Sequence, residues 1–221
     1  PLSAADFGKT FHRLFRLLGN LEYLGSAQTA PFRPVTLDLA GLCRQTAERA
    51  GDLLREAGVT LRYDSGCASL LIPGDPQLLR RLLLGLISNA ARASQQGEVV
   101  LTLRRQGDRA YLTVSHSGPL PGERQLSALL QSDEGELPLP GQGAGLGLSI
   151  CRHIVRLHGG SMVMEWGQSA PAAAVSLPVG PLDGRLSVQT PILGRDGGLD
   201  PVLVELSDLL PAFLFGMEEL D

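Results

Sequence analysis

The sequence lacks several features that define whole classes of protein. No stretch approaches the roughly 18 consecutive apolar residues that a membrane-spanning helix needs, and no cleavable signal stands at the start. The three cysteines are odd in number and widely spaced, which favours reduced thiols over a disulfide framework. There is no internal repeat and no group of residues with metal-ligand spacing. We therefore expect a globular chain in a cytosolic setting, with no direct membrane contact.

Basic charge is also scarce. The 23 Asp and Glu residues outnumber the 19 Lys and Arg residues, and the basic side chains form no stripe, so a nucleic-acid ligand is not expected. With 221 residues, 43% of them hydrophobic, the chain can bury one substantial core and carry appendages. Because it begins at Pro1 and not at methionine, we expect a piece of a longer protein, and membrane spans upstream remain open.

Hydrophobic periodicity divides the chain into three parts. Residues 1–30 place apolar side chains at three- and four-residue spacings, which is typical of an amphipathic helix that needs a partner helix. The prolines at 31 and 34 indicate an extended linker. Residues 31–180 alternate strand and helix patterns, and residues 181–221 form a C-terminal extension.

The middle part predicts an α+β fold. We expect strands at 35–39, 60–63, 69–72, 98–104, 110–115, 162–166 and 173–177, and helices over 42–57, 76–94 and 146–157. Residues 60–63 and 69–72 are expected to form a hairpin-like pair. The order of elements predicts one sheet with its helices packed on one face, a two-layer sandwich.

A glycine-rich segment carries the strongest functional signal. Residues 141–150 read GQGAGLGLSI and lead directly into a helix pattern. Glycines let a backbone approach phosphates closely, and a helix start offers unpaired N–H groups to an anion. A repeat of glycines can equally be a loop hinge, and taken alone the repeat leaves both interpretations open.

The continuation of this segment resembles a known family. The helix pattern runs to His158-Gly159-Gly160 before a strand, and the whole is similar to the second glycine box of the histidine kinase catalytic domain. That domain shares a superfamily with gyrase, heat-shock chaperone and mismatch-repair ATPases. The resemblance covers roughly residues 35–180, and the first helix resembles the second hairpin helix of a kinase dimerisation domain. It implies a Bergerat-type ATPase fold with ATP and Mg²⁺ as ligands, and these residues around the phosphates: Gly143, Gly145, Leu146 and Gly147.

A second segment resembles the asparagine box of the same family. Residues 82–92 read LLLGLISNAAR, and the resemblance implies that Asn89 completes the shell of a Mg²⁺ on the triphosphate. Mg²⁺ takes only one or two protein oxygens, so a single amide can suffice. Gly85 stands where the family usually has another asparagine or an acid. Arg92 matches a basic residue that faces phosphates, although a solvated helix arginine is an equally open interpretation.

The adenine-binding motif departs from the family pattern. Residues 114–121 read VSHSGPLP, with His116 in place of the aspartate that accepts the adenine amino group and Leu120 in place of a second glycine. Gly118 is retained. Losing a charged hydrogen bond costs about 1.5–3 kcal/mol, which is roughly ten- to over a hundredfold in affinity. A nucleotide site with weakened adenine recognition is therefore expected.

No catalytic residue is identified in this chain. His12 is not followed by the acid and the later proline of the family's phosphoacceptor, so we expect a surface histidine and an acceptor outside the chain. His153 and His158 are expected to pack or cap. The resemblance implies a cytoplasmic kinase region, free or part of a membrane-anchored kinase, with a response regulator as partner and a homodimer through the first helix.

Two other functions remain open. A pseudokinase or phosphotransfer scaffold that no longer binds nucleotide is favoured by Gly85, His116 and Leu120. An ATP-hydrolysing member of the chaperone or topoisomerase type is the other, although His158-Gly159-Gly160 and the preceding helix favour the kinase.

The remaining segments predict a lid and a docking element. The acidic, proline-rich residues 122–140 would cover the nucleotide, although no convincing phenylalanine box is present. In the extension, residues 185–190 could add a strand. Asp200-Pro201 begins a helix whose apolar face ends at Pro211, and Phe213, Phe215 and Met217 would extend that face. This apolar area is too large to leave exposed, so we expect the extension to dock on the domain or on a partner.

Overall fold

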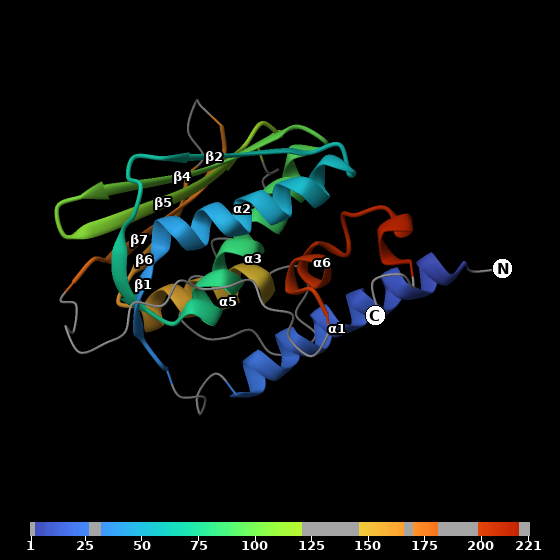
Figure 1. The fold of residues 1–221 in the computed structure, drawn as a ribbon, viewed down its shortest axis with the longest axis horizontal. Helices are drawn as coiled ribbons and strands as arrows, with labels where there is room; N and C mark the ends of the chain where they lie inside the picture. The colour runs from blue at the N-terminus through green and yellow to red at the C-terminus, as the bar shows by residue number, and fades with distance from the viewer. Residues whose placement is uncertain (1–2, 27–31, 121–145, 166–169, 181–198, 217–221) are drawn as a thin grey trace.

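The computed structural model describes residues 3–26, 32–120, 146–165, 170–180 and 199–216 (Figure 1). The helices are α1 (Ala4–Ser26), α2 (Leu39–Arg55), α3 (Pro76–Ser94), α5 (Leu146–Leu157), α6 (Pro201–Leu206) and the 3₁₀ helix η2 (Ala212–Phe215). The strands are β1 (Val35–Asp38), β2 (Thr60–Ser65), β3 (Leu71–Gly74), β4 (Glu98–Gln106), β5 (Arg109–His116), β6 (Ser161–Glu165) and β7 (Ala172–Pro178).

A five-stranded mixed sheet forms one layer of the domain. Its strand order is β2-β4-β5-β7-β6, with β2 parallel to β4 and the other neighbours antiparallel. Helices α2, α3 and α5 cover one face of this sheet (Figure 1). The predicted α+β sandwich is confirmed, and so is the pairing of β4 with β5 across the tight turn in which Gly107 has a φ of +61°.

Two strands pair differently from the prediction. The expected hairpin between residues 60–63 and 69–72 is wrong, because β2 pairs with β4 while β3 pairs with β1 in a separate two-stranded sheet. Asp38 contributes to this outcome. Its carboxylate accepts hydrogen bonds from the N–H groups of Ala40 at 3.1 Å and Leu70 at 2.9 Å, which ties the start of β3 to β1. An alternating pattern identifies a strand but not its partner, so the single expected sheet is two.

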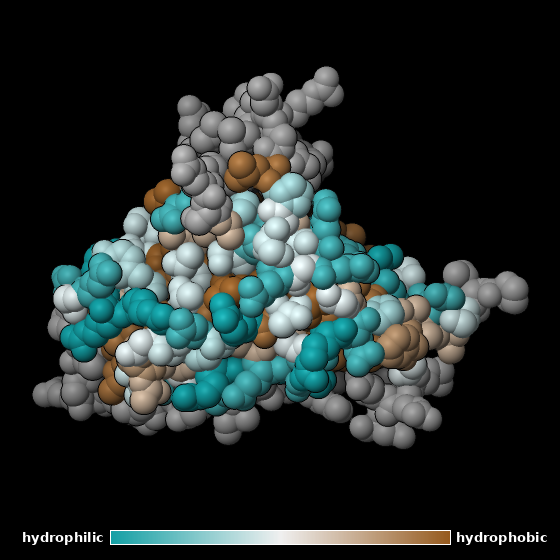
Figure 2. Space-filling view, turned by 90° about the horizontal axis from the view of Figure 1, so that it is seen from above, coloured by the Kyte–Doolittle hydropathy of each residue, from teal (hydrophilic) through white to brown (hydrophobic). Residues whose placement is uncertain are grey.

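The core lies between the sheet and its helices. Leucines of α3 interleave with the inward side chains of β4 and β5, and the large members of this core are fully buried, among them Leu79, Leu82, Leu83, Leu86, Ile87, Leu101 and Leu103. The opposite face of the sheet is mixed but largely hydrophilic (Figure 2). The core therefore fixes the inner faces of α3 and α5 against one surface, and their remaining sides are left to build a site.

Helix α1 lies beyond the helix layer, on the side away from the sheet (Figure 1). None of its residues is buried. Its second half is held directly by the domain: Arg81 donates hydrogen bonds to the Gly19 carbonyl and the Asn20 side chain, both at 2.8 Å, and Tyr23 bonds His153 at 2.8 Å. Much of its apolar surface stays exposed: Phe7, Phe11, Leu14, Phe15, Leu17, Leu18 and Leu21.

The described part of the C-terminal extension packs between α1 and the helices α2 and α3. Helix α6 begins at the predicted Asp200 cap and Pro201, but it ends at Leu206, four residues before the predicted end. Phe213 is 64% exposed and so does not extend the buried apolar surface as predicted, whereas Phe215 is buried. The possible strand at 185–190 and Met217 lie outside the described residues.

The described helices and the three cysteines correspond to two expectations from the sequence, on membrane crossing and on free thiols. None of the described helices has the length and apolarity that a membrane crossing requires. All three cysteines are free, with Cys43 and Cys151 buried. Burial raises the pKa of the Cys151 thiol to about 12, so this thiol is protonated at neutral pH.

Candidate nucleotide-binding site

Helix α3 presents Asn89, and the start of this helix is fixed by two side chains. Asp75 caps the helix by accepting from the N–H groups of Gln77 at 3.0 Å and Leu78 at 3.2 Å. His158 accepts from the N–H of Asp75 at 3.0 Å and bonds the Ile154 carbonyl at 2.7 Å. Burial lowers the pKa of His158, so its ring is neutral and serves as a structural cap, as predicted.

Asn89 faces the first turn of α5. A Cβ on Gly147 would lie 3.8 Å from Nδ2 and 3.9 Å from Oδ1 of Asn89, so the amide is directly beside this helix start. The second residue of α5 can thus approach the asparagine without a side chain between them. Leu146, the first residue of the helix, is partly buried at the same place. The asparagine and the end of the glycine-rich segment therefore meet, although 57 positions separate Asn89 from Leu146 in the sequence.

The amide of Asn89 has free hydrogen-bonding capacity. Its Nδ2 is buried and finds no hydrogen-bond partner among the residues that the structure describes. A buried polar group without a partner costs about 1–3 kcal/mol, and such groups in native proteins are often completed by a ligand, water or ion. A side-chain amide carries both a donor and an acceptor oxygen, which suits a phosphate on one side and a hard cation on the other.

Gly85 lies one helical turn before Asn89 and has a packing role. A Cβ at this position would come 3.0 Å from the Sγ of Cys151 on α5. The residue itself is buried. The absence of a side chain therefore lets α5 lie close to α3, and no polar group from position 85 reaches toward Asn89.

His116 ends β5, and its ring is oriented by the following turn. The N–H of Gly118 donates to His116 Nδ1 at 3.2 Å. Burial lowers the pKa of His116, so the ring is neutral, and with Nδ1 accepting, the proton resides on Nε2. The predicted accepting capacity of this histidine is thus used internally. The ring offers a donor where the family aspartate offers an acceptor.

Gly118 packs tightly against the end of α3. A Cβ here would overlap the carbonyl of Ala93 and come 2.7 Å from its carbon. The neighbouring Ser117 hydroxyl accepts from the N–H of Glu98 at 2.9 Å, which fixes the same crossing. Leu120 is exposed at the end of the described segment. The backbone of Gly118 is therefore required for the fold at this crossing, whatever it contributes to a ligand.

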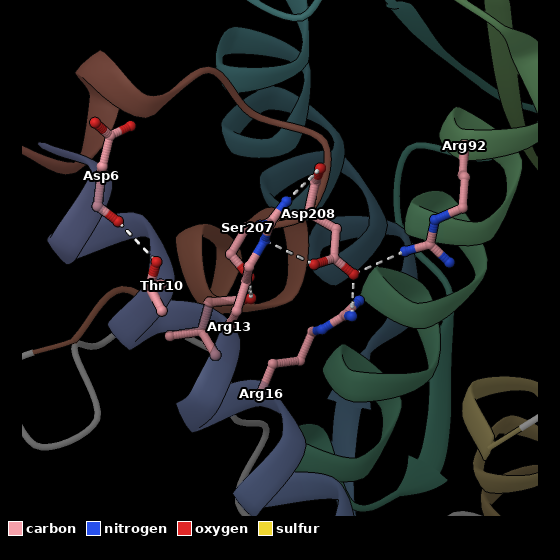
Figure 3. Close-up of polar contacts among 8 residues, drawn as sticks. Asp6, Thr10, Arg13, Arg16, Arg92, Ser207 and Asp208 are labelled. Carbon is pink, nitrogen blue, oxygen red and sulfur yellow. Dashed lines mark hydrogen bonds and ion pairs between the residues drawn. The ribbon is translucent and has the colours of Figure 1, made fainter. Parts of the chain in front are cut away.

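Arg92 lies three positions after Asn89 on α3 and has a different neighbour. Its guanidinium is half exposed and forms an ion pair with Asp208 of the C-terminal extension at 3.4 Å (Figure 3). The sequence did not predict this pairing, because 116 positions separate Arg92 from Asp208. The sequence shows an acid in the extension, but no local pattern shows what that acid contacts.

The other expected site residues lie outside the described part of the chain. These are Gly143, Gly145 and the segment 122–140. In the described residues, no group of three or more His, Cys, Asp and Glu side chains could hold a metal ion. His12 is partly buried and not on an open face as expected, since its ring packs 4.9 Å from that of Phe215.

Comparison with known proteins connects this geometry with a family. Residues 74–180 match the histidine kinase-, DNA gyrase B-, and HSP90-like ATPase family. The adaptive-response sensory kinase SasA of Crocosphaera subtropica is 33% identical over 183 residues, which cover 77% of this chain and 46% of that kinase. The chain thus spans less than half the length of this relative.

Two solved structures share the fold. Full-length ShkA in complex with AMPPNP aligns with a TM-score of 0.62 and 24% identity, over 76% of this chain and 36% of that one. Histidine kinase ThkA in complex with the response regulator protein TrrA aligns with a TM-score of 0.62 and 20% identity, over 76% and 48% of the two chains.

The sheet, the position of Asn89 and the family match together define an ATP-binding domain of the gyrase, chaperone and kinase superfamily. Residues 74–180 carry the domain of that superfamily, and over 77% of its length the chain is similar to a sensory histidine kinase. These relatives give no support to the alternative of a scaffold that has lost nucleotide binding.

Proposed function

We propose that this chain is the ATP-binding region of a two-component sensor histidine kinase, which transfers the γ-phosphoryl group of ATP to a histidine outside this chain. The observation that carries the proposal is the placement of Asn89, whose buried Nδ2 has no partner among the described residues, opposite Gly147 at the start of α5. Phosphoryl transfer depends on positioning and charge neutralisation more than on covalent help from the protein. A site built from an amide and a helix start is therefore sufficient for the nucleotide half of the reaction.

The start of α5 supplies backbone donors for the phosphates. The first N–H groups of a helix have no partner within the helix and carry a partial positive charge. We assign Leu146 and Gly147, with Gly143 and Gly145 before them, to contacts with the triphosphate. Mg²⁺ would be held through the Asn89 amide oxygen, and when bound it neutralises charge on the phosphate oxygens.

The base would lie toward the end of β5, near His116 and Gly118. Because the His116 ring presents a donor, it does not match the amino group of adenine, and we expect modest affinity for ATP. Arg92 contributes to phosphate binding only when it is not held by Asp208. The segment 122–140 is assigned as the lid over the nucleotide.

The partners follow from the same assignment. The exposed apolar stripe of α1 supports a homodimer through this helix, because such a stripe on an amphipathic helix needs a matching surface. We assign residues 1–30 to a dimerisation hairpin, 31–180 to the ATP-binding domain and 181–221 to an added extension. A response regulator would receive the phosphoryl group from the histidine, in a cytoplasmic setting.

Calorimetry with ATP and Mg²⁺ tests the proposal. The chain should bind ATP·Mg²⁺, and Asn89→Ala should weaken binding by about tenfold to a hundredfold, the value of about 1.5–3 kcal/mol for a hydrogen bond to a charged group. Gln77→Ala is the matched control, because Gln77 is an exposed amide side chain on the same helix. The control should bind like the unchanged chain. Absence of heat and of a thermal shift at millimolar ATP would reject the proposal.

A further inference from the structure

The described part of the C-terminal extension forms a bridge between α1 and the ATP-binding domain. Its apolar side chains are taken into the core, since Val202, Leu206 and Leu210 are completely inaccessible to solvent. The bridge contacts α2 and α3 on one side and α1 on the other. Residues 199–216 therefore connect α1 with α2 and α3, in addition to the direct contacts that the second half of α1 makes with the domain.

The domain end of this bridge is fixed by Asp200. One carboxylate oxygen of Asp200 accepts from Nε and Nη2 of Arg49 on α2, at 2.9 and 2.7 Å. The other oxygen caps α6 by accepting from the N–H of Val202 at 2.8 Å. Arginine contacts that use two nitrogens have a defined geometry. The start of the bridge is thus anchored independently of α1.

The α1 end of the bridge is fixed by Asp208 (Figure 3). Its carboxylate pairs with Arg13 at 3.0 Å, with Arg16, and with Arg92 of α3 at 3.4 Å. Arg13 and Arg16 lie one turn apart on α1, so both reach the same acid. One carboxylate therefore joins α1, the extension and α3.

The backbone of α1 also comes very close to this end of the bridge. A Cβ on Gly8 would overlap the carbonyl of Phe215, and the His12 ring packs edge to face on Phe215 at 4.9 Å between centroids. These contacts and the α1 ion pairs all involve residues 4–16, which we call the first half of α1. The second half is held separately through Arg81 and Tyr23.

Charge makes Asp208 the residue on which this contact depends. Arg13, Arg16 and Arg92 place three positive charges around it. Arg16 and Arg92 also act on the side chain of Glu205. Without the charge of Asp208, the guanidinium groups would repel each other across the junction. Single exposed ion pairs contribute little, but a network around one partly buried acid contributes more.

We propose that residues 199–216 are an intramolecular clamp that holds the first half of α1 on the ATP-binding domain, with Asp208 as its charged latch. While the latch is closed, Arg92 pairs with Asp208 and is withheld from the nucleotide. This last consequence rests on the proposed function, whereas the clamp itself does not. Opening the latch frees α1 to change its position relative to the domain and releases Arg92 at the same time.

Hydrogen exchange of the whole chain without nucleotide tests the clamp. Asp208→Asn keeps the shape of the side chain and removes its charge, and should speed amide exchange over residues 4–16 by about tenfold. Residues 19–26 should change little, because their contacts to Arg81 and His153 remain. Arg13→Gln weakens the latch from the α1 side and should accelerate the same residues. Asp52→Asn is the matched control, because among the described residues Asp52 pairs with Arg55 of its own helix, and its loss should leave α1 unchanged.

Salt and nucleotide give two further measurements. In 1 M NaCl, exposed charges are screened within about 3 Å, so the unchanged chain should approach the exchange rates of Asp208→Asn, which itself should respond little. In calorimetry, Asp208→Asn should bind ATP·Mg²⁺ about threefold more tightly. The gain should vanish in an Arg92→Gln background, since no arginine is then left to be released.

The outcomes separate the clamp from the proposed function. Unchanged exchange over residues 4–16 in both Asp208→Asn and Arg13→Gln would overturn the clamp, even if ATP binds. Faster exchange in a chain that binds no ATP in any variant would overturn the proposed function and support the clamp. Equal ATP affinity with and without Asp208, in chains that bind ATP, would overturn the link to Arg92.

Discussion

Helix α3 meets α5 along one side and the C-terminal extension along another, and the polar groups on these two sides differ in how they are paired. On the α5 side the helices approach through glycines at 85 and 147, and the Nδ2 of Asn89 is left without a partner among the described residues. On the extension side, Arg92 has an acid within ion-pair distance. The first side has the unused bonding capacity that a ligand requires, and the second side has used it within the chain.

This difference explains why two neighbouring residues of one motif have different roles. Asn89 and Arg92 are three positions apart, which places them about 60° apart around a helix with 3.6 residues per turn. Residues at this spacing are neighbours on the helix surface, so their different roles come from what each side chain meets: Asn89 lies beside Gly147, and the longer Arg92 reaches Asp208. The sequence motif groups them together, whereas the structure assigns them to two interfaces.

The largest effect should come from Gly118, where the α3 crossing tolerates no side chain. Gly118→Ala would press a methyl group into the Ala93 carbonyl, and overpacking of this kind costs about 1–3 kcal/mol of unfolding free energy. Chemical denaturation measures this loss. Gly19→Ala is the control, since nothing lies within 4 Å of a Cβ there and it should be neutral or stabilising. Equal stability of both variants would contradict the tight crossing.

His116 should have the next largest effect, and in the opposite direction. His116→Asp would replace a ring whose acceptor is already used by Gly118 with a carboxylate that can accept from an adenine amino group. A hydrogen bond to a charged group is worth about 1.5–3 kcal/mol, so ATP affinity should rise by about tenfold. Calorimetric titration with ATP and with GTP measures the gain, which should be absent for GTP. A loss of ATP affinity would place the base elsewhere.

Gly147 offers a sharper comparison, because an added side chain there should change stability and ATP affinity in opposite directions. Gly147→Ala places a methyl group 3.8 Å from Asn89, an ordinary contact, and removes a glycine from a helix, which is worth about 0.5–1 kcal/mol of stability. The melting temperature should therefore rise slightly. ATP affinity should fall by about threefold, since the methyl group narrows the approach to Asn89. A variant with higher stability and unchanged ATP binding would contradict the assignment of this helix start.

How far the sequence predicted these two sides depends on the range of the interactions. Helix α5 begins and ends where its apolar periodicity predicts, and α3 begins at the Asp75-Pro76 cap, because caps and periodicity act over a few residues. The meeting of Asn89 with Gly147 was expected only through the family resemblance. The partner of β2 and the pairing of Arg92 with Asp208 connect distant segments, and no local pattern specifies them.

The smallest effect that we expect concerns pH and compares the α3–α5 contact with the contact of α1 on the domain. Burial lowers the pKa of His158, and burial with a contribution from Arg156 lowers the pKa of His153. Below the ordinary histidine value of about 6.5, the unfolded chain therefore binds protons that the folded chain does not. The stability contributed by the neutral rings is complete above that pH and is lost as the pH falls toward the lower folded values.

Denaturation curves measured between about pH 7.5 and about pH 5, on either side of the ordinary histidine pKa of about 6.5, should show that the free energy of unfolding declines toward acid. His158→Gln should reduce the slope more than His153→Gln. His158 is only 6% exposed and caps α3 through Asp75, while His153 is partly exposed beside Tyr23. A slope that is insensitive to His158 but sensitive to His153 would mean that acid weakens the α1 contact before the α3–α5 contact. In that case the helix pair that forms the nucleotide site would be more resistant to acid than the contact of α1 with the domain.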